Sequence, residues 1–169
     1  MKHSLKTVEI ISMTAAAILG VIFHFIYGWS GENPVAGLFF PVNESTWEHL
    51  KLIFFPILFV SVIEAFFVDA RLRNYLCVKF LSVLIGMALT VICFYTYTGV
   101  YGKNSDIMNI LIYLLSIAAA YAFSYKMLVR EECMHLSTRW CYIGFAALML
   151  LFFLFTIFPP GIGLFASPV

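Results

Sequence analysis

The chain has 169 residues, of which 63% are hydrophobic and 11% are charged, and its mean hydropathy is +0.97. A soluble domain is about 45–50% apolar and about 25% charged, so a water-soluble fold of this composition would expose too much apolar surface. The net charge of +1 gives no general electrostatic attraction to nucleic acid. These values predict an integral membrane protein whose main partner is the lipid bilayer and which has no nucleic-acid partner.

Long apolar segments without period-2 alternation predict membrane helices rather than the strands of a membrane barrel. Each segment is close to the roughly 20 residues that a helix needs to cross a bilayer. The five segments are residues 8–29, 45–69, 78–100, 107–128 and 139–158. We therefore predict an all-α bundle of five transmembrane helices in a single domain, residues 1–169, with the first helix retained rather than cleaved as a signal peptide.

The basic residues predict the orientation of this bundle, because loops rich in Lys and Arg remain in the cytoplasm. If the N-terminus is inside, only Lys51 and Lys103 lie on the outer side. The inner side then holds Lys2, Lys6, Arg71, Arg73, Lys79, Lys126, Arg130 and Arg139. This bias predicts an N-terminus in the cytoplasm and a C-terminus outside.

Small residues recur at intervals of four in three of the segments, which is the pattern that lets membrane helices approach closely. The stripes are Ala16, Gly20 and Gly28, then Ser82, Gly86 and Thr90, then Ser116, Ala120 and Ser124. Pro56 lies near the centre of the second helix, where the missing backbone donor predicts a kink. The cysteines, Cys77, Cys93, Cys133 and Cys141, show no ligand spacing, and we interpret them as filling apolar space. Three of them are expected on or near the cytoplasmic side, where thiols stay reduced.

Residues 39–56, FFPVNESTWEHLKLIFFP, contain the start of the second helix. Ser45 as N-cap and Glu48 three residues later fit a capping box, and Asn43 is an alternative cap. Lys51 is three residues after Glu48, so the two side chains are expected to pair on one face. This interpretation gives Glu48 a structural role.

A second interpretation places a polar pocket at the outer mouth of the bundle, lined by His24, Glu44, Glu48 and His49, with Glu64 below it. An ionisable residue inside a membrane span favours function, although Glu64 could instead pair with Arg71 or Arg73. No cofactor is firmly implied, but His24, Glu44 and His49 are ligand types that bind a divalent metal such as zinc or iron. A hydrogen-bond network, a proton relay and a polar solute site are the alternatives.

The segments PVNESTWEHLKLIFFP, YTGVYGKNSDI and FPPGIGLF give the chain a distinctive pattern. In these it resembles an uncharacterised family of small bacterial polytopic membrane proteins that carry an NES-x-WEHLK element. The matching positions are Asn43, Glu44, Ser45, Trp47, Glu48, His49, Leu50 and Lys51. The resemblance implies a multi-pass protein of the bacterial cytoplasmic membrane and implies no reaction.

Three functions remain open at this stage. The first is the binding or permeation of a small polar solute or ion through the outward-facing pocket. The second is a membrane-embedded, metal-dependent hydrolase, with His24 and His49 as ligands and Glu44 or Glu48 as ligand or general base. The third is a structural or accessory membrane subunit. Five helices without an inverted repeat are few for a transporter, so we expect a homo-oligomer or a partner membrane subunit.

Overall fold

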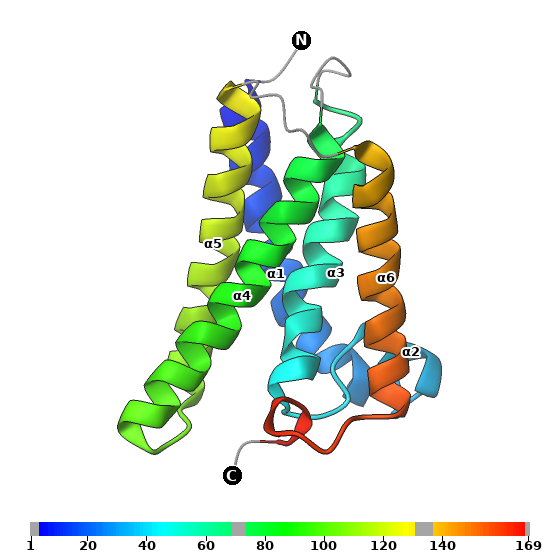
Figure 1. Ribbon diagram of the computed structural model, residues 1–169, viewed down its shortest axis with the longest axis vertical. Helices are drawn as coiled ribbons and strands as arrows, with labels where there is room; N and C mark the ends of the chain where they lie inside the picture. Colours follow the sequence, from blue (N-terminus) through cyan, green and yellow to red (C-terminus); the bar gives the residue numbers. More distant parts are fainter. Residues whose placement is uncertain (1–3, 69–73, 131–136, 168–169) are drawn as a thin grey trace.

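The computed structural model describes residues 4–68, 74–130 and 137–167, and the regular secondary structure in this part of the chain is all helical. Its elements are α1 (Leu5–Trp29), α2 (Pro34–Phe39), α3 (Thr46–Glu64), α4 (Tyr75–Tyr101), α5 (Asp106–Arg130), α6 (Thr138–Ile157) and the 3-10 turn η1 (Gly163–Phe165) (Figure 1). All the helices except α2 are long and apolar enough to cross a membrane. The prediction of a helical protein with five such helices is confirmed.

Helix α3 forms the centre of the bundle. It contacts α1 on one side and α4 on another, and α6 also packs against it; α5 lies on the outer side of α1 and α4 (Figure 1). Ile53, Phe54 and Phe55 of α3 are completely buried. Because α3 is enclosed by protein on nearly all sides, its polar side chains must find partners on the neighbouring helices.

The end of α3 and the presence of α2 differ most from the sequence prediction. The second segment was expected to be helical over residues 45–69, but α3 ends at Glu64 and turns follow over residues 65–67. The apolar run continues through Phe66 and Phe67, so hydropathy alone did not mark this end. The short helix α2 was not predicted, although Asn33 caps it and Pro34 occupies its first turn, which are ordinary start signals. Pro56 lies buried in the interior of α3.

The small-residue stripes hold helices together at most of the predicted positions. A Cβ atom at Gly20 would lie 2.8 Å from the carbonyl oxygen of Leu52 and would clash with the hydroxyl of Tyr113. On α4, Gly86 lies against Ile53 and Ala120 in the same way. Gly28 has open space where its Cβ would be, so its predicted packing role is wrong. This last turn of α1 brings no described residue of another helix within 4 Å of the Cβ position at Gly28.

A disulfide joins Cys77 at the start of α4 to Cys141 at the start of α6. The Cα atoms are 5.2 Å apart and both side chains are completely buried. The prediction of reduced thiols is therefore wrong for these two cysteines, because their pairing depends on how α4 and α6 meet and not on any local spacing. Cys93 is a free, half-buried thiol, and Cys133 lies outside the described residues.

The packing at Gly20 can be tested by substitution. Gly20→Ala should lower the free energy of unfolding by about 1–3 kcal/mol, because the added methyl meets the backbone of α3 as well as Tyr113. Gly28→Ala is the matched control on the same helix and should not be destabilising. Thermal unfolding of both variants in mild detergent checks this. Equal stability of the two variants would show that α1 does not approach α3 as closely as described.

Candidate functional site

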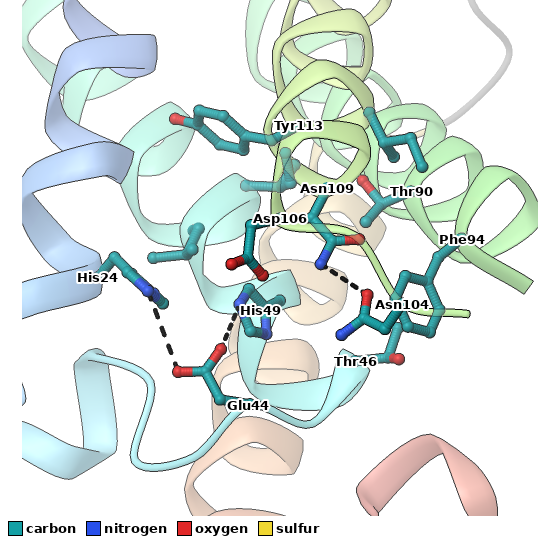
Figure 2. A pocket seen from close by; sticks show the side chains of 13 residues that line it. His24, Glu44, Thr46, His49, Thr90, Phe94, Asn104, Asp106, Asn109 and Tyr113 are labelled. Carbon is teal, nitrogen blue, oxygen red and sulfur yellow. Dashed lines mark hydrogen bonds and ion pairs between the residues drawn. The ribbon is translucent and has the colours of Figure 1, made fainter. Parts of the chain in front are cut away.

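A cavity of about 380 Å³ lies where α1 approaches its end and α3 and α5 begin (Figure 2). Its walls come from four helices and two connecting segments. The polar side chains that line it are His24, Glu44, Thr46, His49, Thr90, Asn104, Asp106, Asn109 and Tyr113. On the membrane orientation predicted from the basic residues, this end of the bundle faces outward.

Three of the side chains predicted to form a pocket meet on one wall of this cavity. A carboxylate oxygen of Glu44 lies 3.4 Å from Nε2 of His49, and the other lies 4.0 Å from Nε2 of His24 (Figure 2). The two imidazole rings are 5.4 Å apart, centre to centre. One nitrogen of each ring and one oxygen of the carboxylate all lie within 4.8 Å of one another. The two histidines are about one-third exposed, so the cluster is open to the cavity.

The hydrogen bonding of His49 fixes which ring nitrogen faces Glu44. Its Nδ1 atom is 3.0 Å from the backbone carbonyl oxygen of Ser45, and a carbonyl can only accept a hydrogen bond. Nδ1 therefore carries the proton, and in the neutral ring Nε2 presents a lone pair toward the carboxylate. A lone pair and a carboxylate oxygen repel each other at this distance unless a proton or a metal ion lies between them.

His24 adds a second unsatisfied group to the cluster. Its Nδ1 atom is buried and has no hydrogen-bond partner within the described part of the chain, while its Nε2 atom faces Glu44. Most buried polar atoms in proteins are hydrogen-bonded, so this buried nitrogen is unusual. The atom of His24 that can take part in the cluster is Nε2.

The opposite wall is built by the turn between α4 and α5. Nδ2 of Asn109 donates to Oδ1 of Asn104 at 2.9 Å (Figure 2). The hydroxyl of Tyr97 contacts both amides. Asp106, the first residue of α5, adds a carboxylate to this wall. These residues were not among those predicted from the sequence to line the pocket. The concentration of amide and acidic side chains in GKNSDIMN was the available signal.

The inner side of the cavity is more apolar. Leu52, Ile53 and Ile112 line it there, and Ile53 is completely buried. Tyr113 spans the gap between α5 and α1, and its hydroxyl donates to the carbonyl oxygen of Ala17 at 2.9 Å. The polar contents of the cavity are therefore held near one end of the bundle.

Glu48, which was predicted to line the pocket, points away from the cavity. Its carboxylate is 2.6 Å from Nζ of Lys51 and accepts hydrogen bonds from Val42 N at 3.0 Å and from the hydroxyl of Thr156 at 3.0 Å. Nζ of Lys51 also donates to the carbonyl oxygen of Gly37 at 2.7 Å. Both charged side chains are buried, and together they join α3 to α2 and α6.

The predicted capping box is present only in part. Oγ of Ser45 accepts a hydrogen bond from Glu48 N at 3.3 Å, as an N-cap should. Glu48 does not return a bond to Ser45 N, because Oδ1 of Asn43 already accepts that hydrogen at 2.9 Å. Asn43 therefore leaves the Glu48 carboxylate available for Lys51.

Glu64 also lies outside the cavity, at the opposite end of the bundle. It pairs there with Lys79, whose Nζ atom lies 2.8 Å from Oε1 of Glu64. The cations proposed for it from the sequence, Arg71 and Arg73, fall outside the described residues. Of the five residues named for the pocket, the structure brings together His24, Glu44 and His49.

The buried Glu48–Lys51 pair has a clear energetic signature. Lys51→Met should lower the free energy of unfolding by about 3–5 kcal/mol, because it leaves a buried carboxylate without its cation. Adding Glu48→Gln to Lys51→Met should restore much of the loss, since the remaining group is then neutral. Lys103→Met, at an exposed position, should change stability by about 0.5 kcal/mol or less. Equal losses in the single and double variants, measured by chemical unfolding, would contradict the pairing.

Comparison with known proteins adds a family to this picture. No curated protein and no solved structure matches the chain significantly. A family model does match it, over residues 1–169, and that family carries no assigned function, in agreement with what the sequence resemblance implied. The chain belongs to the family of unknown function DUF6512.

Proposed function

We propose that the protein binds a small cation in the cavity, and that a divalent transition-metal ion such as Zn²⁺ is the cation its ligands suit best. One observation carries the proposal: Nε2 of His49 lies 3.4 Å from the Glu44 carboxylate, while Nδ1 of the same ring lies 3.0 Å from a backbone carbonyl oxygen. Ligand atoms about 2.1 Å from a tetrahedral zinc ion lie about 3.4 Å from one another. The separations among one ligand atom from each of His24, Glu44 and His49 reach 4.8 Å, so these side chains would move closer together on binding such an ion.

The ligand types agree with this choice of ion. Imidazole nitrogen and carboxylate oxygen together favour zinc, iron or copper over magnesium and calcium, which prefer oxygen alone. Two histidines and one glutamate also leave a fourth coordination position for water or a small polar solute. In this protein that position faces a cavity with amide and carboxylate groups on its far wall.

Binding is better supported than permeation. The apolar side chains of Leu52, Ile53 and Ile112 lie on the inner side of the cavity, where a conduction path would need polar groups. On the predicted orientation, the protein would collect its ion at the outer face of the bacterial cytoplasmic membrane. A homo-oligomer or a partner subunit would supply any further transport step.

A metal-dependent hydrolase is the second candidate, favoured by the open fourth position and by Asp106 on the cavity wall. Glu48 is unsuited to act as its general base, because that carboxylate is buried against Lys51. Asp106 would instead accept the proton of metal-bound water. An Asp106→Asn variant that retains metal but loses hydrolysis of a peptide or ester substrate would distinguish this activity from binding alone.

Calorimetric titration of the untagged, detergent-purified protein with Zn²⁺ tests the proposal. We expect the wild-type protein to bind one ion per chain. The affinity for Zn²⁺ should be about 100-fold weaker in His24→Ala, His49→Ala and Glu44→Gln, because each variant loses a ligand. Glu32→Gln removes an exposed carboxylate from the same α1–α3 connection, outside the cavity, and should bind normally. Acidification should weaken binding, since a protonated imidazole cannot coordinate a metal.

The titration results can be interpreted as effects on metal binding if thermal unfolding shows that every variant is folded. Absence of Zn²⁺ binding by the wild-type protein would overturn the metal proposal. Unchanged affinity in both histidine variants would do the same, because the ion would then be bound elsewhere on the chain.

A further inference from the structure

A second polar site lies at the opposite end of the bundle from the cavity, near the N-terminus in Figure 1. Glu9 of α1, Glu64 of α3 and Lys79 of α4 meet there, and we refer to them as the triad. Nζ of Lys79 is 2.8 Å from Oε1 of Glu9 and 2.8 Å from Oε1 of Glu64. All three side chains are at least 97% buried. The triad is independent of the proposed cation site, with which it shares no residue.

The charges of the triad do not balance if both carboxylates are ionised. Among the residues that the structure describes, one ammonium group then faces two carboxylates, which leaves one excess negative charge at this site. Three neutral groups also contact the triad: the hydroxyl of Ser124, and the rings of Tyr75 and Tyr121, whose centres lie 5.5 and 4.8 Å from Nζ of Lys79. An uncompensated buried charge is unfavourable, and two carboxylates that share one site commonly retain a proton.

The oxygen contacts distinguish the two carboxylates. Both oxygens of Glu64 lie within 2.9 Å of Nζ of Lys79, as in an ordinary ion pair. In Glu9, Oε1 accepts hydrogen bonds from Lys79 and from Ser124, both at 2.8 Å. Oε2 of Glu9 is buried and has no hydrogen-bond partner among the described residues. A neutral carboxyl group has this asymmetry, with one carbonyl oxygen that accepts and one oxygen that carries hydrogen.

We propose that the triad is a buried proton-binding site, in which Oε2 of Glu9 holds the proton. The proton comes from water and forms one O–H bond, which converts the Glu9 carboxylate into a carboxylic acid. Lys79 and Glu64 then remain as a neutral ion pair. The hydroxyl of Tyr121, whose ring lies against Lys79, is also buried without a hydrogen-bond partner among the described residues. Ionisable groups held inside a membrane span in this way are characteristic of proton-handling sites.

Release of this proton would change the competition for Lys79. An ionised Glu9 on α1 and an ionised Glu64 on α3 would then attract the same ammonium group. Ser124 of α5 donates to Glu9, so a change at Glu9 also reaches α5. The site therefore links its protonation state to the contacts among four helices.

Infrared spectroscopy of the full-length protein in lipid nanodiscs, recorded across a pH series in H₂O and D₂O, tests the assignment. We expect a carbonyl stretching band of a protonated carboxyl group at neutral pH, shifted in D₂O and absent from Glu9→Gln. Glu32→Gln, which removes an exposed carboxylate, should retain the band. Glu9→Gln should unfold at nearly the wild-type temperature, because the amide resembles a neutral carboxyl group in size and charge.

Ser124→Ala provides a readout that leaves every ionisable group in place. Loss of one hydrogen bond to Oε1 should move the same band to higher frequency without removing it. A wild-type protein without such a band at any pH where it remains folded would overturn the proposal. A band that survives in Glu9→Gln and disappears in Glu64→Gln would overturn the assignment to Glu9.

Discussion

The fold depends on one constraint: α3 is enclosed by other helices and yet carries charged side chains at both of its ends. Glu48 and Lys51 are buried near its beginning, and Glu64 is buried at its last residue. Removal of one partner from a buried ion pair costs several kcal/mol, so the helices that supply partners must lie close to α3. Thr156 of α6 donates a hydrogen bond to Glu48 of the first pair. At the other end of α3, Lys79 of α4 pairs with Glu64 and also with Glu9 of α1.

Adjacent residues in the first turn of α3 have different roles: Glu48 forms a buried ion pair, and His49 belongs to the proposed cation site. Glu48 points toward Lys51 and α6, whereas His49 faces Glu44 and His24 across the cavity. Successive helical residues are separated by about 100°, so neighbours in the sequence can serve opposite sides of one helix. Because the Glu48–Lys51 pair fixes the rotation of α3, it also fixes the direction in which His49 presents its ring.

The sequence was most informative where a feature depended on one helix and its flanking loop. Five apolar segments could be recognised by length and composition, and the Ser45 cap by local pattern. His24 and Glu44 could be placed near His49 because the end of one membrane helix and the start of the next lie at similar depth. Hydropathy missed the end of α3 at Glu64, because the apolar run continues past it.

Features that depend on contacts between distant helices were beyond the sequence. The pairing of Glu9 with Lys79 spans 70 residues, and Lys79 was counted simply as a cytoplasmic cation. The disulfide between Cys77 and Cys141 spans 64 residues. Asn104 and Asn109 belong to the cavity only because the α4–α5 turn lies beside the start of α3. Such contacts are set by the packing of several helices at once, which no local pattern records.

The contact between Tyr113 and α1 has a mechanical consequence. The hydroxyl of Tyr113 binds the backbone at Ala17, eight residues after Glu9 and seven before His24, which is roughly 11 Å from each along the helix axis. Gly20 removes the bulk that would otherwise hold α1 away from this point. The contact is therefore positioned as a fulcrum: a small tilt of α1 about it would displace the ends at Glu9 and His24 by similar amounts in opposite directions.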